Sequence, residues 1–180
     1  MRIVQIGLDY IPAEDRMLLK LGTEPPYDLK YWVTRRYFRL LWTALVEALE
    51  RHLSEDRGLG EAARRAVLAM RQQEKLASTD FSQPFRDVRV PSGKAGGAPA
   101  PALYPLLHGV ALKQKAQGAW AIDFILRDRQ RIGIGMDDEI MLSLCALMQK
   151  TLTAADWDLR LKGLEAVVLA AAPGRGGALH

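Results

Sequence analysis

A repeated change of hydrophobic period constrains this chain more than any other feature of its sequence. Apolar residues alternate with polar ones along three successive segments, and the spacing then changes to three and four residues. Alternation is typical of strands with one buried face, whereas the wider spacing is typical of an amphipathic helix. The order strand, strand, strand, helix is present near the beginning of the chain and again in its second half.

The first unit covers residues 1–54. Alternation predicts strands at residues 4–10, 17–21 and 27–33, separated by turns. A helix is predicted after Thr34, whose hydroxyl suits the N-cap position. The apolar face of this helix carries Phe38, Leu41, Trp42, Leu45, Leu49 and Leu53.

The second unit covers residues 105–158. Its strands are predicted at residues 106–114, 120–126 and 132–136, and Asp137 is the predicted cap of the helix that follows. The apolar side of that helix carries Ile140, Met141, Leu144, Cys145, Met148 and Leu152.

A shift of 103 positions superimposes the two units without a gap from Met17 to Leu49. The apolar positions coincide, and so do the caps Thr34 and Asp137, although residue identities are nearly absent. An internal duplication and an independent use of one common pattern both remain open.

The remaining segments connect these units. Residues 55–90 are predicted to hold a bridging helix at 61–77 and an extended segment, and residues 91–104, rich in glycine, alanine and proline, a flexible linker. Residues 159–180 are predicted to be a C-terminal segment with a flexible tail. The fold class is therefore α+β, with two βββα units, each meander under its own helix, plus the bridging helix. Whether the meanders form one sheet or two stays open.

Composition limits where in the cell the protein can be expected and which kinds of partner it can bind. The chain of 180 residues has a net charge of +4, which permits contact with nucleic acid without demanding it. The single cysteine excludes an internal disulfide. Residues 1–10 alternate instead of forming the apolar run of an export signal, and no apolar run is long enough to cross a bilayer, so we expect a cytoplasmic protein without membrane contact.

Arginines at the start of the first helix are the most unusual local feature. Arg35, Arg36 and Arg39 lie where the helix dipole disfavours positive charge. They predict a site for an anion or a partner's carboxylate, with a solvated basic edge as the alternative. The corresponding start of the second helix carries Asp137, Asp138 and Glu139. This complementary acidic edge could pair with the basic start, within one chain or between chains.

Trp32 is predicted to point away from the core face, on the side of the sheet that also carries Leu18. The bridging helix or a partner could cover it, or its ring could stack on nucleic-acid bases.

No catalytic, metal-binding or cofactor-binding pattern is found in the sequence. Cys145 lies on the apolar side of a helix, and His52, His108 and His180 share no metal-ligand spacing. We therefore expect a non-enzymatic protein–protein interaction or assembly module. Its edge strands make a homodimer plausible. The alternative is a nucleic-acid-binding protein that uses Arg35, Arg36, Arg39 and Trp32.

Overall fold

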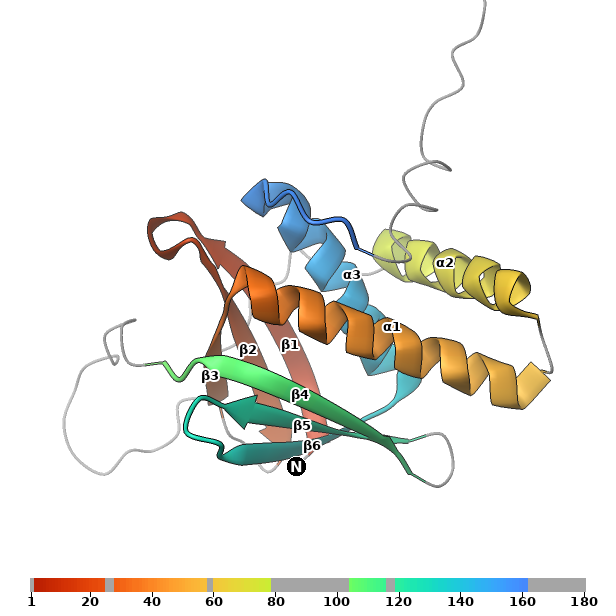
Figure 1. Ribbon diagram of the computed structural model, residues 1–180, viewed down its shortest axis with the longest axis horizontal. Helices are drawn as coiled ribbons and strands as arrows, with labels where there is room; N and C mark the ends of the chain where they lie inside the picture. The colour runs from red at the N-terminus through yellow and green to blue at the C-terminus, as the bar shows by residue number, and fades with distance from the viewer. Residues whose placement is uncertain (1, 25–27, 58–59, 79–103, 116–118, 162–180) are drawn as a thin grey trace, which may run out of the picture.

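In a computed structural model, the chain forms two antiparallel three-stranded meanders covered by three helices (Figure 1). The structure describes residues 2–24, 28–57, 60–78, 104–115 and 119–161. The strands of the first meander are β1 (Arg2–Ile11), β2 (Arg16–Glu24) and β3 (Asp28–Val33). Those of the second are β4 (Leu107–Gln114), β5 (Trp120–Leu126) and β6 (Arg131–Met136). The helices are α1 (Arg35–Arg57), α2 (Glu61–Ser78) and α3 (Asp138–Ala155).

The predicted α+β class and its βββα units are confirmed. A shift of 103 positions places β3 on β6 residue for residue, and it places the first residue of α1 on the first residue of α3. The third strands and the helix starts of the two units thus coincide, whereas β1 and β2 are each two residues longer than their counterparts β4 and β5. Whether a duplication produced them remains a hypothesis.

The two meanders join into one six-stranded sheet with the order β3-β2-β1-β6-β5-β4. The join is a short parallel contact between β1 and β6, in which Arg2 pairs with Gly135. A second parallel bridge connects Trp32 of β3 with Leu106, and the Trp32 N–H donates to the Pro105 carbonyl at 2.9 Å. Trp32 and Gly135 are 103 positions apart, as are Arg2 and Pro105. The first strand of each unit therefore meets the third strand of the other at equivalent places.

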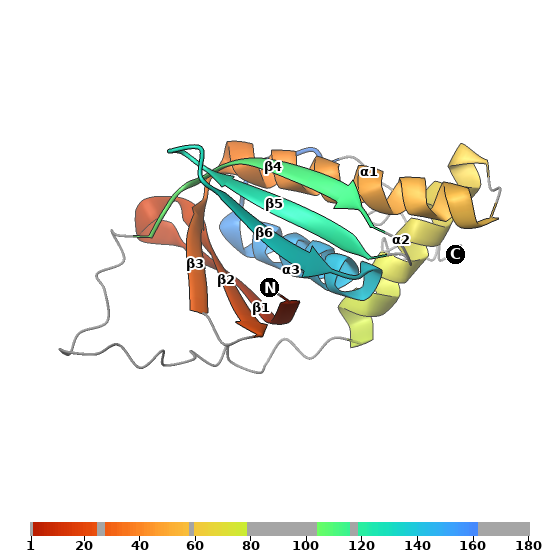
Figure 2. The same cartoon turned by 90° about the horizontal axis from the view of Figure 1, so that it is seen from below.

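The helices are exchanged between the meanders. Among the strands, α1 packs chiefly on β4 of the second meander, and α3 packs chiefly on β1 of the first (Figures 1 and 2). A buried hydrogen bond of 3.1 Å from the Thr151 hydroxyl to the Leu8 carbonyl fastens α3 to β1. The expectation that each meander packs under its own helix is therefore wrong. The sequence pattern fixes which face of a helix is apolar, but not which sheet that face covers.

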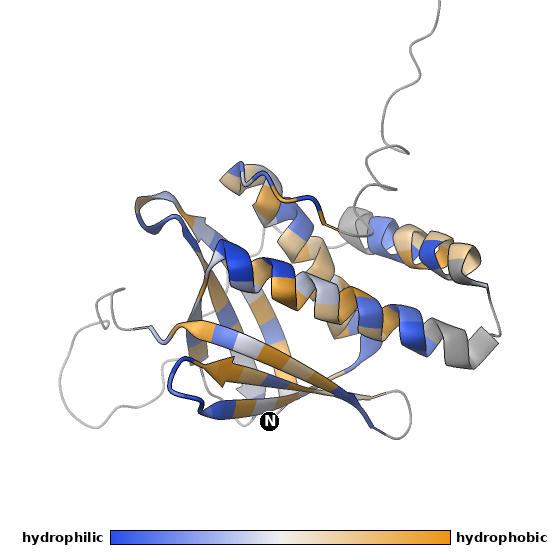
Figure 3. Cartoon of the chain, viewed as in Figure 1, coloured by the Kyte–Doolittle hydropathy of each residue, from blue (hydrophilic) through white to orange (hydrophobic). Residues whose placement is uncertain are grey.

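α3 is buried around most of its circumference. Met141, Leu144 and Met148 lie on one side of the helix, while Leu142, Ala146 and Gln149 lie on a neighbouring side and are also buried. A helix that is buried this widely needs a second layer above it. α2 supplies that layer, because it packs on both α3 and α1. Figure 3 shows apolar residues along α3 and the strands, and hydrophilic ones at the first turn of α1 and the tip of the β5–β6 hairpin.

The bridging helix predicted at 61–77 is confirmed as α2, whereas other predicted segments are untested. The linker at residues 91–104 and the tail after residue 161 lie almost entirely outside the described residues. None of the described helices combines the length and apolar content needed to span a membrane.

Replacement of Gln149 should stabilise the protein. Both polar atoms of its amide are buried without a hydrogen-bond partner among the described residues, and the residue is 7% exposed. A buried polar group without a partner costs about 1–3 kcal/mol. We expect Gln149→Leu to raise the free energy of unfolding by about 1–2 kcal/mol, measured by urea denaturation. The exposed Gln73 of α2 provides the control, because Gln73→Leu should change that free energy by less than about 0.5 kcal/mol. A loss of stability in Gln149→Leu would contradict the expectation.

Candidate functional site

The predicted anion site at the start of α1 contains a carboxylate from the chain itself. The Thr34 hydroxyl caps the helix as predicted, because it accepts a hydrogen bond from the Tyr37 N–H at 3.2 Å. Arg35 forms an ion pair with Asp15 in the β1–β2 turn, with 3.0 Å between Nη2 and Oδ2. Asp15 adopts the left-handed backbone conformation, with φ of 46°. Arg35, although itself exposed, is therefore engaged within the fold, and Arg36 and Arg39 are exposed as well.

Asp15 also connects the two units. Its Oδ1 accepts hydrogen bonds from the Trp157 indole N–H at 2.8 Å and from the Tyr10 hydroxyl at 3.1 Å. The Arg35 guanidinium lies 5.4 Å from the centre of the Trp157 ring, within the range of a cation–π contact. The hydrogen bonds from Trp157 and then from Arg35 lower the pKa of Asp15. Burial, followed by the hydrogen bond to Asp15, raises the pKa of Tyr10.

The start of α3 is engaged in the equivalent manner. Asp137 is the N-cap, as predicted, since its Oδ1 accepts from the Ile140 N–H at 2.9 Å. Asp138 accepts from the Trp120 indole N–H at 2.8 Å, and its second oxygen lies 3.2 Å from Nε2 of His52. The Nδ1 atom of His52 lies 3.3 Å from the side-chain amide of Gln114 at the end of β4.

The two helix starts have separate partners among the described residues. Arg35 pairs with Asp15, and Asp138 pairs with His52. Each start instead meets the C-terminal end of the opposite helix, where His52 and Trp157 lie. Glu139 is exposed, and its carbonyl accepts from the Ser143 hydroxyl. Pairing between chains stays a prediction.

Trp32 is buried, which corrects the expectation of an outward-facing platform. The residue is 3% exposed, and its ring contacts Tyr104 in an edge-to-face arrangement with 6.1 Å between ring centres. Leu18 pairs with Trp32 across the strands and is half-buried. The segment that leads into β4 supplies this cover. Sequence reasoning missed it because the parallel bridge to Leu106 joins segments about 70 positions apart.

Large exposed apolar side chains identify surfaces that a partner could cover. Among the described residues these are Val4, Leu40 and Met70. Leu40, which is 45% exposed, directly follows Arg39 and lies one turn after Arg36 on the outer face of α1. The basic surface predicted at Arg36 and Arg39 therefore has an exposed apolar side chain, Leu40, at its centre.

A hollow of about 240 Å³ opens beside the start of α3. It is lined mainly by apolar atoms of Lys115, Ala119, Trp120, Gly135, Met136, Asp137 and Ile140. The counterpart of Gly135 in the first unit is Trp32, so a glycine stands here where the other unit has an indole. The lining includes Lys115 and Asp137, the cap of α3. It does not combine a nucleophile with a general base, as a catalytic site of that kind would need.

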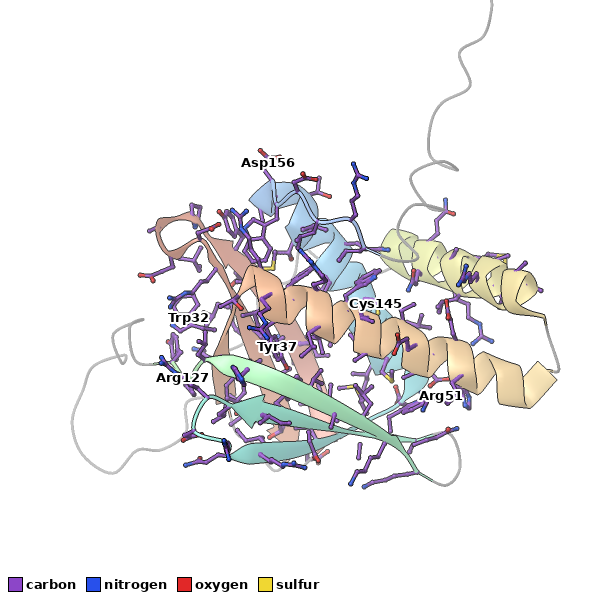
Figure 4. All side chains as sticks on the ribbon, in the orientation of Figure 1. Trp32, Tyr37, Arg51, Arg127, Cys145 and Asp156 are labelled. Carbon is purple, nitrogen blue, oxygen red and sulfur yellow. The ribbon has the colours of Figure 1, made fainter. Side chains whose placement is uncertain are left out.

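The remaining reactive side chains are placed apart from one another. Cys145 is buried, and burial raises the pKa of its thiol to about 12. His52 is engaged with Asp138, His108 is exposed on β4, and His180 lies outside the described residues. In the part of the chain that the structure describes, no three histidine, cysteine, aspartate or glutamate side chains gather as a metal site would need. Figure 4 shows Cys145 and Trp32 in separate regions of the molecule.

No protein-family model matches this chain, and no curated protein sequence or solved structure matches it.

Several functional candidates are visible only in the structure. Asp15 and Trp157 lie 142 positions apart, so no local pattern could have joined them. His52 was considered only as a metal ligand, and its pairing with Asp138 depends on the exchange of helices. The sequence did contain one signal that was not used, the alternation of arginines at 127, 129 and 131.

The carboxylate of Asp15 should contribute to acid stability. Its pKa is lower in the folded protein than the usual 3.8, so its contribution is complete above that value and is lost as the pH falls through the folded value. We expect the wild type to exceed Asp15→Asn in free energy of unfolding at about pH 7, and the difference to shrink steadily below about pH 4. Denaturant titrations across this pH range measure it. In Trp157→Phe, which lacks the indole N–H, the folded pKa of Asp15 should be lowered less, so the decline should be smaller and should end at a higher pH. A constant difference at all pH values would refute the role of Asp15.

Cys145 should be chemically inert in the folded protein. With a pKa of about 12, only about one thiol in ten thousand is ionised at about pH 8. We expect a disulfide reagent to leave the native protein unmodified over hours and to label one thiol per chain in denaturant. Rapid labelling of the native protein would contradict this burial.

Proposed function

We propose that this protein is a non-enzymatic interaction module that binds an acidic protein partner at the start of α1. The observation that carries the proposal is Leu40, an exposed apolar side chain flanked by the exposed arginines Arg36 and Arg39. An apolar anchor within a charged rim is the usual composition of a protein-binding surface.

Charge complementarity favours an acidic partner. The helix dipole and the two arginines place positive charge at this end of α1, and in the described part of the chain the neighbouring Arg35 is paired with the carboxylate of Asp15. A partner surface with carboxylates around an apolar side chain would match both properties. Self-association, in which a second copy of this chain supplies the acidic surface, is one form of the same proposal.

The platform beneath this surface is rigid. Phe38 and Trp42 on the inner side of α1 are fully buried, and Phe38 contacts the Trp157 ring edge-to-face at 5.7 Å between ring centres. The exposed residues therefore project from a helix that is fixed on the body of the molecule. A preorganised surface of this kind loses less conformational freedom on binding.

Site-specific photo-crosslinking tests the proposal. We expect p-benzoylphenylalanine in place of Leu40 to form a discrete protein adduct in host cells, and Arg36→Glu with Arg39→Glu to abolish it. The same photoreactive residue in place of Met70, an exposed apolar position on α2, is the matched control and should give no such adduct. An adduct of twice the mass of the chain would identify self-association, which sedimentation should then confirm as a dimer that the arginine variants dissociate.

Two results would exclude this surface. One is the absence of an adduct at position 40. The other is an adduct that persists after both charge reversals, because binding would then not depend on the basic rim.

A further inference from the structure

The tip of the β5–β6 hairpin carries a second basic surface, separate from the start of α1. Residues 127–131 contain three arginines and one carboxylate, and all five are exposed. Figures 1 and 2 show this tip at the same end of the long axis as the first turn of α1, but on the sheet and not on the helical layer. Figure 4 shows Arg127 at this end.

The tip is a well-defined hydrogen-bonded turn. The Arg129 N–H donates to the Leu126 carbonyl at 3.0 Å, and the Leu126 N–H donates to the Gln130 carbonyl at 2.9 Å. The carboxylate of Asp128 accepts from the Gln130 N–H at 3.0 Å. The carboxylate of Asp128, the single acidic group of the tip, is thus used to build the turn. The three arginines are exposed to solvent, where a partner could reach them.

The backbone of Arg129 adopts a conformation that costs free energy for an arginine. Its φ is 69°, in the left-handed region that glycine and asparagine adopt most easily. The other described non-glycine residues with positive φ are Asp15 and Asp156, and aspartate tolerates this conformation better. A strained residue in a turn that glycine would suit, placed among like charges, indicates a functional use of its side chain.

The composition of the tip favours nucleic acid over an acidic protein. Residues 127–131 include no apolar side chain, so the apolar centre that a protein interface needs is missing here, in contrast to Leu40 on α1. Arginine forks bind phosphate oxygens in pairs.

We propose that the β5–β6 hairpin tip binds nucleic acid through contacts of Arg127, Arg129 and Arg131 with the phosphodiester backbone. This site uses neither Trp32 nor Arg35, which the fold occupies. It is independent of the protein-binding surface around Leu40.

Fluorescence anisotropy with a labelled single-stranded DNA of mixed sequence tests the proposal, with a duplex of the same sequence in parallel. We expect the full chain to bind at low salt and the affinity to fall steeply as salt is added. Arg127→Gln with Arg131→Gln should lower the slope of log affinity against log salt by about two. The matched control is Lys113→Gln with Lys115→Gln, which removes two exposed charges from the other end of the second meander and should leave the slope unchanged.

Arg129→Gly separates binding from folding. Glycine relieves the left-handed backbone, so this variant should unfold at a higher denaturant concentration than the wild type, yet its salt slope should fall by about one. A gain in stability with unchanged binding would overturn the proposal, because the strained arginine would then have no role in binding.

Three further outcomes would also overturn it. The first is no binding to either DNA at low salt, and the second is an equal loss of binding in the lysine control. The third is displacement of the DNA by polyglutamate as effectively as by unlabelled DNA of equal charge, which would make the tip a surface for acidic proteins.

Discussion

The burial of α3 is the constraint on which the rest of the structure depends. This helix has apolar residues around most of its circumference, and only a narrow strip that includes Ser143 and Lys150 escapes full burial. Water cannot be the neighbour of Leu142 or Ala146 without a large loss of hydrophobic stabilisation. The sheet covers one side of α3, and α2 must then cover another. The position of α2 follows from the composition of a helix that lies 60 residues further along the chain.

The exchange of helices joins the two units more strongly than the short strand contacts between them. The parallel bridges at Arg2 and Trp32 are brief, whereas α1 and α3 each lie across the other unit's first strand. The polar contacts follow the same exchange. Asp15, which pairs with Arg35 at the start of α1, binds Trp157 just beyond α3, and Asp138 at the start of α3 pairs with His52 near the end of α1. The equivalent positions Arg35 and Asp138 thus carry opposite charges, yet each takes part in a contact to the other end of the opposite helix.

Local features of the fold were predictable from sequence, because they depend on neighbouring residues. The strands, the caps Thr34 and Asp137, and the 103-residue offset all follow from hydrophobic period and capping chemistry. The burial of Trp32 was not predictable, because its cover comes from Tyr104, a residue near in space and distant in sequence. The arginine site was half predictable. Charge pattern indicated Arg36 and Arg39, but no pattern could show that Arg35 is neutralised by Asp15 from a preceding turn.

The long separation between contacts that close the fold has a consequence for synthesis on the ribosome. Leu8 and Asp15 obtain their partners from Thr151 and Trp157, more than 140 positions later. Until α3 has left the exit tunnel, β1 lacks the helix that covers it, and the first meander presents an incomplete core to the cell. Apolar surface of the first meander therefore stays open to proteases and chaperones until α3 has been made. The same exchange that holds the folded molecule together makes the folding of its first strands wait for its last helix.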